Sequence, residues 1–244
     1  MTAQPGQSGA LISASILNAD FSRLDRVVHK LERAGIDRLH LDVMDGSFVD
    51  NITFGPDIIK AFRRLTDMPL DVHLMIAEPA RYIDRFIESQ PQTITFHVET
   101  QESDEHKDAA IAAIHAASMG AGLAVSPETP VAAVADRANE LDIIMIMTVH
   151  PGWGGQGFIA EAAPKIAEAR ALLAAAGRGG LVHVDGGVNS KTAEVVGRHG
   201  IDVCVVGSAL FQRGSDASGE VELVRQRVAR GREAFVTADS GEGS

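Results

Sequence analysis

The sequence predicts one α/β domain, a closed (β/α)8 TIM barrel in which eight parallel strands are each followed by a helix. Short apolar runs rich in β-branched residues alternate with longer runs of helical periodicity. Eight such units in about 230 residues match this barrel in number and length. Polar residues near positions 39, 72, 97 and 184 lie on separate predicted strands. A closed barrel gives them a common interior, whereas a doubly wound open sheet, the alternative for repeated βα units, does not.

Each predicted unit begins with a strand. The strands cover residues 10–16, 37–43, 69–75, 93–98, 120–125, 142–149, 180–185 and 202–207. The helical patterns cover residues 20–34, 56–66, 79–89, 106–119, 130–139, 162–176, 190–199 and 220–235. Asp20 is typical of a helix start, and Gly35 is typical of the position after a helix end. Prolines stand at or near first-turn positions, where a missing N–H does no harm: Pro56, Pro79, Pro130 and Pro164.

The barrel domain is expected over residues 10–236, between tails over 1–9 and 237–244 that are small, polar and expected to be disordered. The chain has 33 acidic and 22 basic residues and therefore a net charge of −11, which argues against nucleic acid or an anionic membrane as a partner. Residues 1–9 lack the pattern of a secretory signal, and no apolar run is long enough to span a bilayer. We therefore expect a cytoplasmic protein. The single cysteine, Cys204, excludes an intrachain disulfide and is interpreted as a core residue.

Four ionisable residues lie near the C-terminal ends of predicted strands: His40 and Asp42 on the second, His73 on the third and Asp185 on the seventh. Alternate residues of a strand share a face, so His40 and Asp42 point the same way. Catalytic residues of TIM barrels lie at this end of the strands. Alone, each histidine would be interpreted as a core residue and each aspartate as a helix cap. Together, two imidazoles and two carboxylates among apolar neighbours predict a site for one divalent ion, Zn²⁺, Fe²⁺, Mn²⁺ or Co²⁺.

Other histidines have weaker interpretations. We expect His97 and Glu99 on the fourth strand, and His183 on the seventh, to orient the metal ligands. His150 ends the sixth strand and either faces the site or caps the loop. Histidines of the predicted helices are expected to be surface residues without a role: His29, His106, His115 and His199.

Turns of small residues predict a phosphate site after the last strands. The loop after the sixth strand, Pro151–Phe158, contains Gly152, Gly154 and Gly155, whose backbone N–H groups can converge on an anion. The two following junctions offer similar turns, at Gly186 with Gly187 and at Gly207 with Ser208. Backbone donors at helix starts bind phosphate without any lysine. Either junction alone would be an ordinary βα turn, whereas the pair favours phosphate binding.

Several segments, in order, resemble the ribulose-phosphate 3-epimerase family. They are Ser15–Phe21, His40–Gly46 with Phe48 and Val49, Asn51–Gly55, Asp71–Met75, Pro151–Phe158 and Val184–Val188. The resemblance extends from about residue 10 to about residue 230. It implies a TIM barrel of the ribulose-phosphate binding type and one divalent metal ion per subunit. It also implies interconversion of D-ribulose 5-phosphate and D-xylulose 5-phosphate in the pentose phosphate pathway, and a homo-oligomer.

The resemblance also implies a role for each matching residue. Metal ligands would be His40, Asp42, His73 and Asp185, with Asp42 and Asp185 also the two acid/base groups. Ser15 and His73 would contact the substrate, and three methionines would cap the reaction centre: Met44, Met75 and Met147. The phosphate would be held by Gly152, Gly154, Gly155, Gly186, Gly187, Gly207 and Ser208. One base on each face of an enediolate, whose charge the metal stabilises, explains why the chemistry needs two carboxylates.

Some residues depart from the family pattern without touching the implied ligands: Asp50, Ser126, His150, Trp153 and His183. They leave open a sister 3-epimerase that acts on another ketose phosphate, such as allulose 6-phosphate or a tetrulose phosphate. A barrel lyase or decarboxylase of the hexulose-phosphate-synthase kind would have an Asp-x-Lys-x-x-Asp run on a strand, and none occurs. A non-catalytic barrel is disfavoured, because every polar group that the chemistry needs is present. No dinucleotide-binding fingerprint occurs in the sequence.

Overall fold

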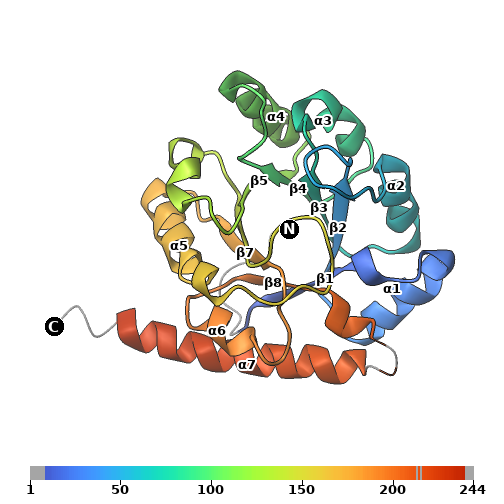
Figure 1. The fold of residues 1–244 in the computed structure, drawn as a ribbon, viewed down its shortest axis with the longest axis vertical. Helices are drawn as coiled ribbons and strands as arrows, with labels where there is room; N and C mark the ends of the chain where they lie inside the picture. The colour runs from blue at the N-terminus through green and yellow to red at the C-terminus, as the bar shows by residue number, and fades with distance from the viewer. Residues whose placement is uncertain (1–8, 213, 215, 240–244) are drawn as a thin grey trace.

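The computed structural model describes residues 9–212, 214 and 216–239 and has the predicted architecture. Eight parallel strands pair in chain order, and the last pairs with the first, which closes the barrel (Figure 1). The strands are β1 (Leu11–Ser15), β2 (Arg38–Met44), β3 (Leu70–Met75), β4 (Thr93–His97), β5 (Gly120–Val125), β6 (Ile143–Met147), β7 (Leu181–Asp185) and β8 (Val203–Val206). This closure confirms the TIM barrel and excludes the doubly wound sheet.

Helices form the outer ring of the barrel (Figure 1). They are α1 (Leu24–Arg33), α2 (Pro56–Leu65), α3 (Pro79–Ile87), α4 (Asp104–Ala116), α5 (Lys165–Ala176), α6 (Ala193–Gly197) and α7 (Ala217–Asp239). Short 3₁₀ segments are η1 (Ile16–Asn18), η2 (Phe21–Arg23), η3 (Val131–Arg137), η4 (Ala160–Ala162) and η5 (Ser208–Leu210). The short helix α6 lies against α7, and a side chain at Gly197 would collide with the backbone of Val228.

Several predicted elements differ from the structure in type or length. The helix expected over 130–139 is the 3₁₀ segment η3, whose buried residues Val131 and Val134 have the three-residue spacing of a 3₁₀ turn. The helix expected over 190–199 shortens to α6. The last helix, α7, runs to Asp239, past the expected domain end at residue 236. The rest of the expected tails, residues 1–8 and 240–244, lies outside the described residues. Within the described part of the chain, no helix is long and apolar enough to cross a membrane.

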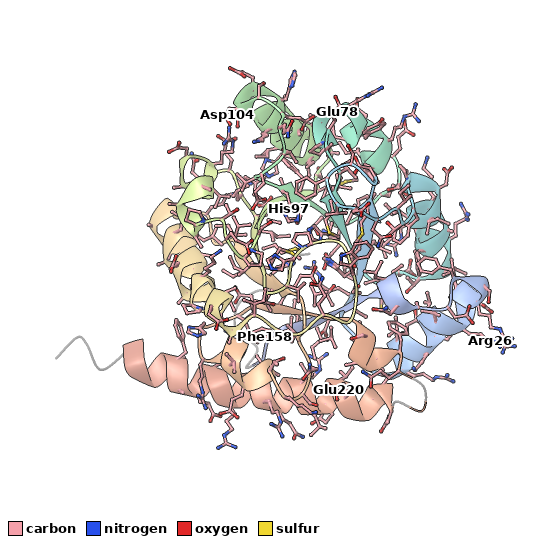
Figure 2. The ribbon with its side chains drawn as sticks, viewed as in Figure 1. Arg26, Glu78, His97, Asp104, Phe158 and Glu220 are labelled. Atoms are coloured by element: carbon pink, nitrogen blue, oxygen red, sulfur yellow. The ribbon has the colours of Figure 1, made fainter. Side chains whose placement is uncertain are left out.

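The main core lies between the sheet and the outer helices, and it includes Cys204 as expected. The barrel interior is filled by alternate strand residues, which form a polar layer near its N-terminal end. Here the buried Asp71 carboxylate accepts hydrogen bonds from Ser13 Oγ at 3.0 Å and Thr93 Oγ1 at 2.9 Å, and lies 3.5 Å from Arg38 Nη1. These partners offset the cost of burying its charge. Figure 2 shows His97 inside the ring of strands, in contrast to Asp104 on the outer surface.

Three aspartates repeat one contact at the N-terminal end of the barrel. Each immediately precedes or begins a strand and accepts a hydrogen bond from a backbone N–H of the preceding strand. The pairs are Asp37 with Ile12 N at 2.7 Å, Asp142 with Ala121 N at 2.9 Å and Asp202 with Val182 N at 2.9 Å. Each carboxylate also pairs with an arginine: Arg225, Arg178 and Arg170, respectively. The repeat ties neighbouring strands together away from the predicted site.

Asp202→Ala should lower the free energy of unfolding by about 2 kcal/mol, because it leaves the Val182 N–H without its acceptor and removes a charged partner of Arg170. Urea unfolding followed by circular dichroism measures this. Asp67→Ala is the control, since its side chain is fully exposed and lies 4.0 Å from Arg63. An equal midpoint for both variants would contradict a structural role for the repeated contact.

Candidate active site

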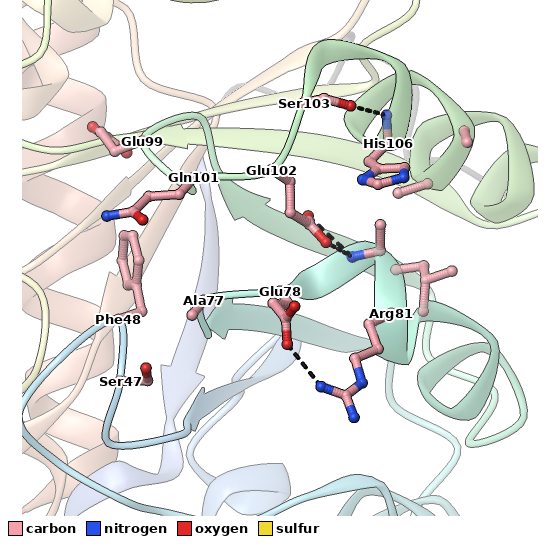
Figure 3. Close-up of a pocket in the computed structure, with 14 residues that line it drawn as sticks. Ser47, Phe48, Ala77, Glu78, Arg81, Glu99, Gln101, Glu102, Ser103 and His106 are labelled. Atoms are coloured by element: carbon pink, nitrogen blue, oxygen red, sulfur yellow. Dashed lines mark hydrogen bonds and ion pairs between the residues drawn. The ribbon is translucent and has the colours of Figure 1, made fainter.

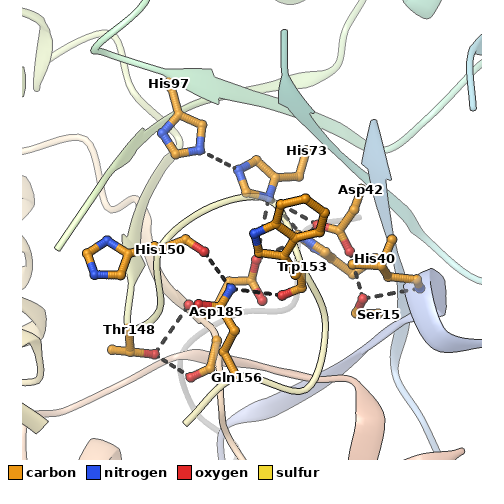
Figure 4. A network of polar contacts seen from close by, with 12 residues as sticks. Ser15, His40, Asp42, His73, His97, Thr148, His150, Trp153, Gln156 and Asp185 are labelled. Atoms are coloured by element: carbon orange, nitrogen blue, oxygen red, sulfur yellow. Dashed lines mark hydrogen bonds and ion pairs between the residues drawn. The ribbon is translucent and has the colours of Figure 1, made fainter. Parts of the chain in front are cut away.

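The four predicted metal ligands come together inside the C-terminal end of the barrel (Figure 4). In β2, His40 and Asp42 alternate with apolar residues that face the helices, so both point inward. The register of β2 and β3 places Asp42 beside His73. Asp185 ends β7 and reaches the cluster from a different part of the ring. The strand pattern and the register thus bring residues distant in the sequence to one point.

Four side-chain atoms of the cluster face one another. His40 Nε2 lies 3.3 Å from Asp42 Oδ1 and 3.7 Å from Asp185 Oδ2. His73 Nδ1 lies 3.3 Å from Asp42 Oδ1 and 3.5 Å from Asp185 Oδ2. All four atoms lie within 4.8 Å of one another. This spacing suits four donors that surround one ion, and a set of two nitrogens and two oxygens fits a divalent first-row cation.

Burial and charge give the cluster a strong preference for a cation. Burial disfavours a charged His40 ring, but the Asp42 and Asp185 carboxylates outweigh it and raise the pKa of His40 to about 9. The same carboxylates raise the pKa of His73 against its burial. The Asp42 carboxyl is buried, yet the two imidazoles hold its pKa well below the usual range. The carboxylates therefore attract positive charge at this point, and a divalent cation would satisfy that attraction in place of protons.

Ser15 and the three predicted methionines surround the cluster. Ser15 Oγ donates to Asp42 Oδ2 at 2.6 Å, which leaves Asp42 Oδ1 facing the two histidines. Met44 and Met75 are neighbours in the register of β2 and β3, and Met147 is paired with Asp185. All three methionines are buried and line the same cavity as Asp42 and Asp185. The cavity thus has polarisable apolar walls and two carboxylates.

The predicted glycine loop crosses the mouth of this cavity. Asn51 Nδ2 donates to Gly152 O at 2.7 Å, and Gln156 Nε2 donates to the carbonyls of His150 and Trp153 at 2.7 and 2.9 Å. Gly154 packs directly on the Asn18 side chain, where any Cβ would collide with it. In Figure 4 the Trp153 ring lies in front of the cluster. The loop therefore depends on glycine for its close approach to η1.

The turns after β6, β7 and β8 line the other side of the cavity. All seven predicted phosphate-binding residues are among the residues that line it. Thr148 Oγ1 donates to Gly186 O at 2.6 Å, and Asn189 Nδ2 and Thr192 Oγ1 donate to Gly187 O, each at 3.0 Å. The N–H groups of Gly187, Gly207 and Ser208 are not used in backbone hydrogen bonds within the described residues. No lysine or arginine of the described chain lines the cavity. An anion there would be bound by backbone amides.

Some predicted roles differ from the observed placement. The His150 side chain points away from the cluster, because it is largely exposed and lies 3.3 Å from Glu128 Oε1. Neither ring nitrogen of the buried His183 has a hydrogen-bond partner within the described chain, so no contact allows it to orient a ligand. His115 has a structural role after all, since its Nε2 lies 2.7 Å from Asp142 Oδ2. His97 and Glu99, in contrast, do connect to the cluster.

Sequence reasoning missed several residues that line the cavity, chiefly Asn18, Gln156 and Asn189. Asn18 ends η1 directly after β1, and Asn189 follows the Gly186–Gly187 turn. Their position after C-terminal strand ends was the available signal. Gln156 had no such signal, because its role depends on how the loop folds back on itself.

A second, larger cavity lies outside the cluster (Figure 3). It is a groove of about 1070 Å³ between α3 and α4, lined by Phe48, Glu78, Arg81, Glu99 and Glu102, among others. None of the four predicted metal ligands lines it. The cavity at the cluster measures only about 80 Å³ beneath the glycine loop. Chemistry rather than size therefore identifies the site.

Comparisons with known proteins show the family to which the chain is similar. The model of the ribulose-phosphate 3 epimerase family matches residues 11–211. The chain is 41% identical to ribulose-phosphate 3-epimerase of Bacillus subtilis, over 88% of this chain and 97% of that protein. It is 40% identical to the chloroplastic ribulose-5-phosphate-3-epimerase of Arabidopsis thaliana, over 84% of this chain and 73% of that protein.

The solved structure of 3-hexulose-6-phosphate synthase from Salmonella typhimurium resembles this fold with a TM-score of 0.69. The match covers 91% of this chain and 99% of that one, but at 16% identity it shows a common fold alone. The family match and the two epimerases, in contrast, share sequence over most of the barrel. This enzyme therefore belongs to the ribulose-phosphate 3-epimerase family.

Proposed function

We propose that the chain epimerises C3 of D-ribulose 5-phosphate to give D-xylulose 5-phosphate, with Asp42 and Asp185 as the two acid/base groups. The observation that carries this proposal is the convergence of two carboxylates, from β2 and β7, on the same point as two imidazoles. Inversion at a carbon next to a carbonyl requires removal of a proton from one face and delivery of a proton to the other. Two carboxylates attached to different strands suit these two tasks.

The residues divide the work as follows. His40, Asp42, His73 and Asp185 would hold one divalent cation, which supplies the positive charge that stabilises an enediolate. Asp185 is the more accessible carboxylate, with 15% of its side chain exposed against 3% for Asp42. Ser15 orients the Asp42 carboxylate through its hydrogen bond to Oδ2. The methionine walls exclude water from the carbon that loses its proton.

The phosphate would be bound by the N–H groups of the turns at Gly187, Gly207 and Ser208, with the glycine loop Gly152–Gly155 above it. A substrate of this size needs more room than the cavity offers beneath the loop, so the loop has to move for the substrate to enter. This arrangement also fits a sister 3-epimerase of another ketose phosphate. The lyase alternative is disfavoured, because no lysine lines the cavity within the described residues.

Proton NMR of D-ribulose 5-phosphate in D₂O, with the metal-loaded protein, tests the proposal. We expect the C3–H signal to disappear while xylulose 5-phosphate forms. Exchange without the epimer would mean that only one base acts on this sugar and would favour a sister substrate. No exchange by protein with metal bound would contradict the proposal.

Four finer points stay predictions. We propose a homo-oligomer, a cytoplasmic location and a place in the pentose phosphate pathway, on the strength of the family membership. The cation is proposed as Zn²⁺, Fe²⁺, Mn²⁺ or Co²⁺, since the donor set suits each of them.

A further inference from the structure

We propose that Glu99 and His97 are positioning residues that set the tautomer of His73, so that its Nδ1 presents a lone pair to the cation. This inference rests on the metal site of the proposed function and adds two residues that lie outside the ligand set. It concerns the direction of two hydrogen bonds, which decides whether a buried imidazole can act as a ligand at the nitrogen that faces the cluster.

Three side chains, Glu99, His97 and His73, form a continuous line from the edge of the barrel to the cluster. Figure 4 shows its inner part, where His97 contacts His73. Glu99 Oε2 lies 3.0 Å from His97 Nδ1. His97 Nε2 lies 3.0 Å from His73 Nε2, and the two rings are stacked with centroids 5.1 Å apart. The other nitrogen of His73, Nδ1, faces Asp42 and Asp185. Both imidazoles are completely buried, so no bulk water competes for these contacts.

Glu99, at the outer end of this line, determines which atom donates and which accepts in each of its hydrogen bonds. Glu99 Oε1 accepts the backbone N–H of Ser126 at 2.6 Å, a donor that cannot be reversed. Burial disfavours the charged Glu99 carboxyl, but its hydrogen bonds to His97, Thr129 and Ser126 lower its pKa to about 2. Both oxygens of Glu99 are therefore acceptors, and His97 Nδ1 must donate to Oε2. Glu99 is the only one of the three that lines the open groove shown in Figure 3.

The remaining steps follow from the two nitrogens of a neutral imidazole. The neutral His97 ring has a single N–H, and the acceptor Glu99 Oε2 places it on Nδ1. With that proton on Nδ1, His97 Nε2 accepts and His73 Nε2 donates. A neutral His73 then has its lone pair on Nδ1, at the cluster. His40 contrasts with this, because its Nδ1 has no partner within the described residues.

The substitution Glu99→Gln tests the direction of these hydrogen bonds, because it leaves the shape of the side chain almost unchanged. An amide has one acceptor oxygen and one donor NH₂, so it cannot accept from both Ser126 and His97. With its oxygen on the Ser126 N–H, the amide donates to His97 Nδ1. The two following bonds then reverse, and a proton is placed on His73 Nδ1, where the cation should bind.

The matched control is Glu102→Gln. Glu102 lines the same groove, and its carboxylate accepts from Ala80 N at 3.1 and 3.2 Å, without contact to the three-residue line. It therefore loses the same charge at a similar place. Metal affinity is measured with Zn²⁺ in competition with a chromophoric chelator. We expect Glu99→Gln to bind Zn²⁺ roughly 10- to 100-fold more weakly than the wild type, and Glu102→Gln to bind it equally well.

A second measurement needs no variant. Nitrogen-15 NMR of the Zn²⁺-loaded wild type should show a protonated Nδ1 and a bare Nε2 in His97. The opposite tautomer, or unchanged Zn²⁺ affinity in folded Glu99→Gln, would overturn the inference while the metal site stands. A wild type that fails to bind Zn²⁺ stoichiometrically would instead contradict the metal site of the proposed function.

Discussion

Asp185→Asn should lower kcat by roughly 10²- to 10⁴-fold, because an amide of the same shape cannot take up or return a proton. Asp185 ends β7 with 15% of its side chain exposed, so the barrel should remain folded. Steady-state conversion of ribulose 5-phosphate measures the loss. The metal content of the same sample must be determined, since Asp185 is also one of the four proposed ligands.

The control for this substitution is Asp67→Asn, which removes a carboxylate that is fully exposed in the structure. It should leave kcat unchanged. Wild-type activity of Asp185→Asn with its metal retained would remove Asp185 from the proton transfer and would assign the reaction to a single base.

Removal of the cation should abolish activity reversibly. Without it, a proton on His40 replaces the cation, and this single positive charge is already offset by the Asp42 and Asp185 carboxylates that it faces, so little is left to stabilise an enediolate. Because the pKa of His40 is raised to about 9, reloading has to displace this proton, and the apparent metal affinity should rise with pH up to about that value. Dialysis against a chelator, followed by assay before and after addition of Zn²⁺, Mn²⁺, Fe²⁺ or Co²⁺, measures the effect.

Elemental analysis of the dialysed protein provides the check on this experiment. Residual activity should scale with residual metal. Full activity in a preparation verified to be free of metal would show that the reaction needs no cation, and the four-residue cluster would then need another explanation.

The barrel and the ligand set were predictable because both depend on short-range periodicity. Alternation along a strand decides which face a side chain occupies, so His40 and Asp42 had to point to the same side. The repeated βα pattern then required that all strands end on one rim, which collected His73 and Asp185 as well. The glycine turns after the last strands could be predicted as part of the site because the same βα pattern places them on that rim.

Contacts between separate strands and loops were not predictable from these patterns. The alternation in β4 places His97 inside the barrel, but only the packed interior brings its Nε2 to 3.0 Å from His73. His150 lies just after a strand, a position as suitable for a ligand as those of the predicted ligands. The path of the loop nevertheless turns its side chain toward Glu128. Asn18 became part of the cavity because Gly154 packs on it from across the barrel.

The sequence by itself thus determined the closed barrel, the rim that carries the site and the four residues that would bind a cation. Those properties follow from the alternation of apolar and polar residues in each strand and from the repeated βα pattern, both of which can be read from the local sequence. Only the tertiary structure decided the line of contacts from Glu99 through His97 to His73, the close approach of the glycine loop and the orientation of His150. These depend on side-chain rotamers and loop paths, which non-local packing selects among many local possibilities.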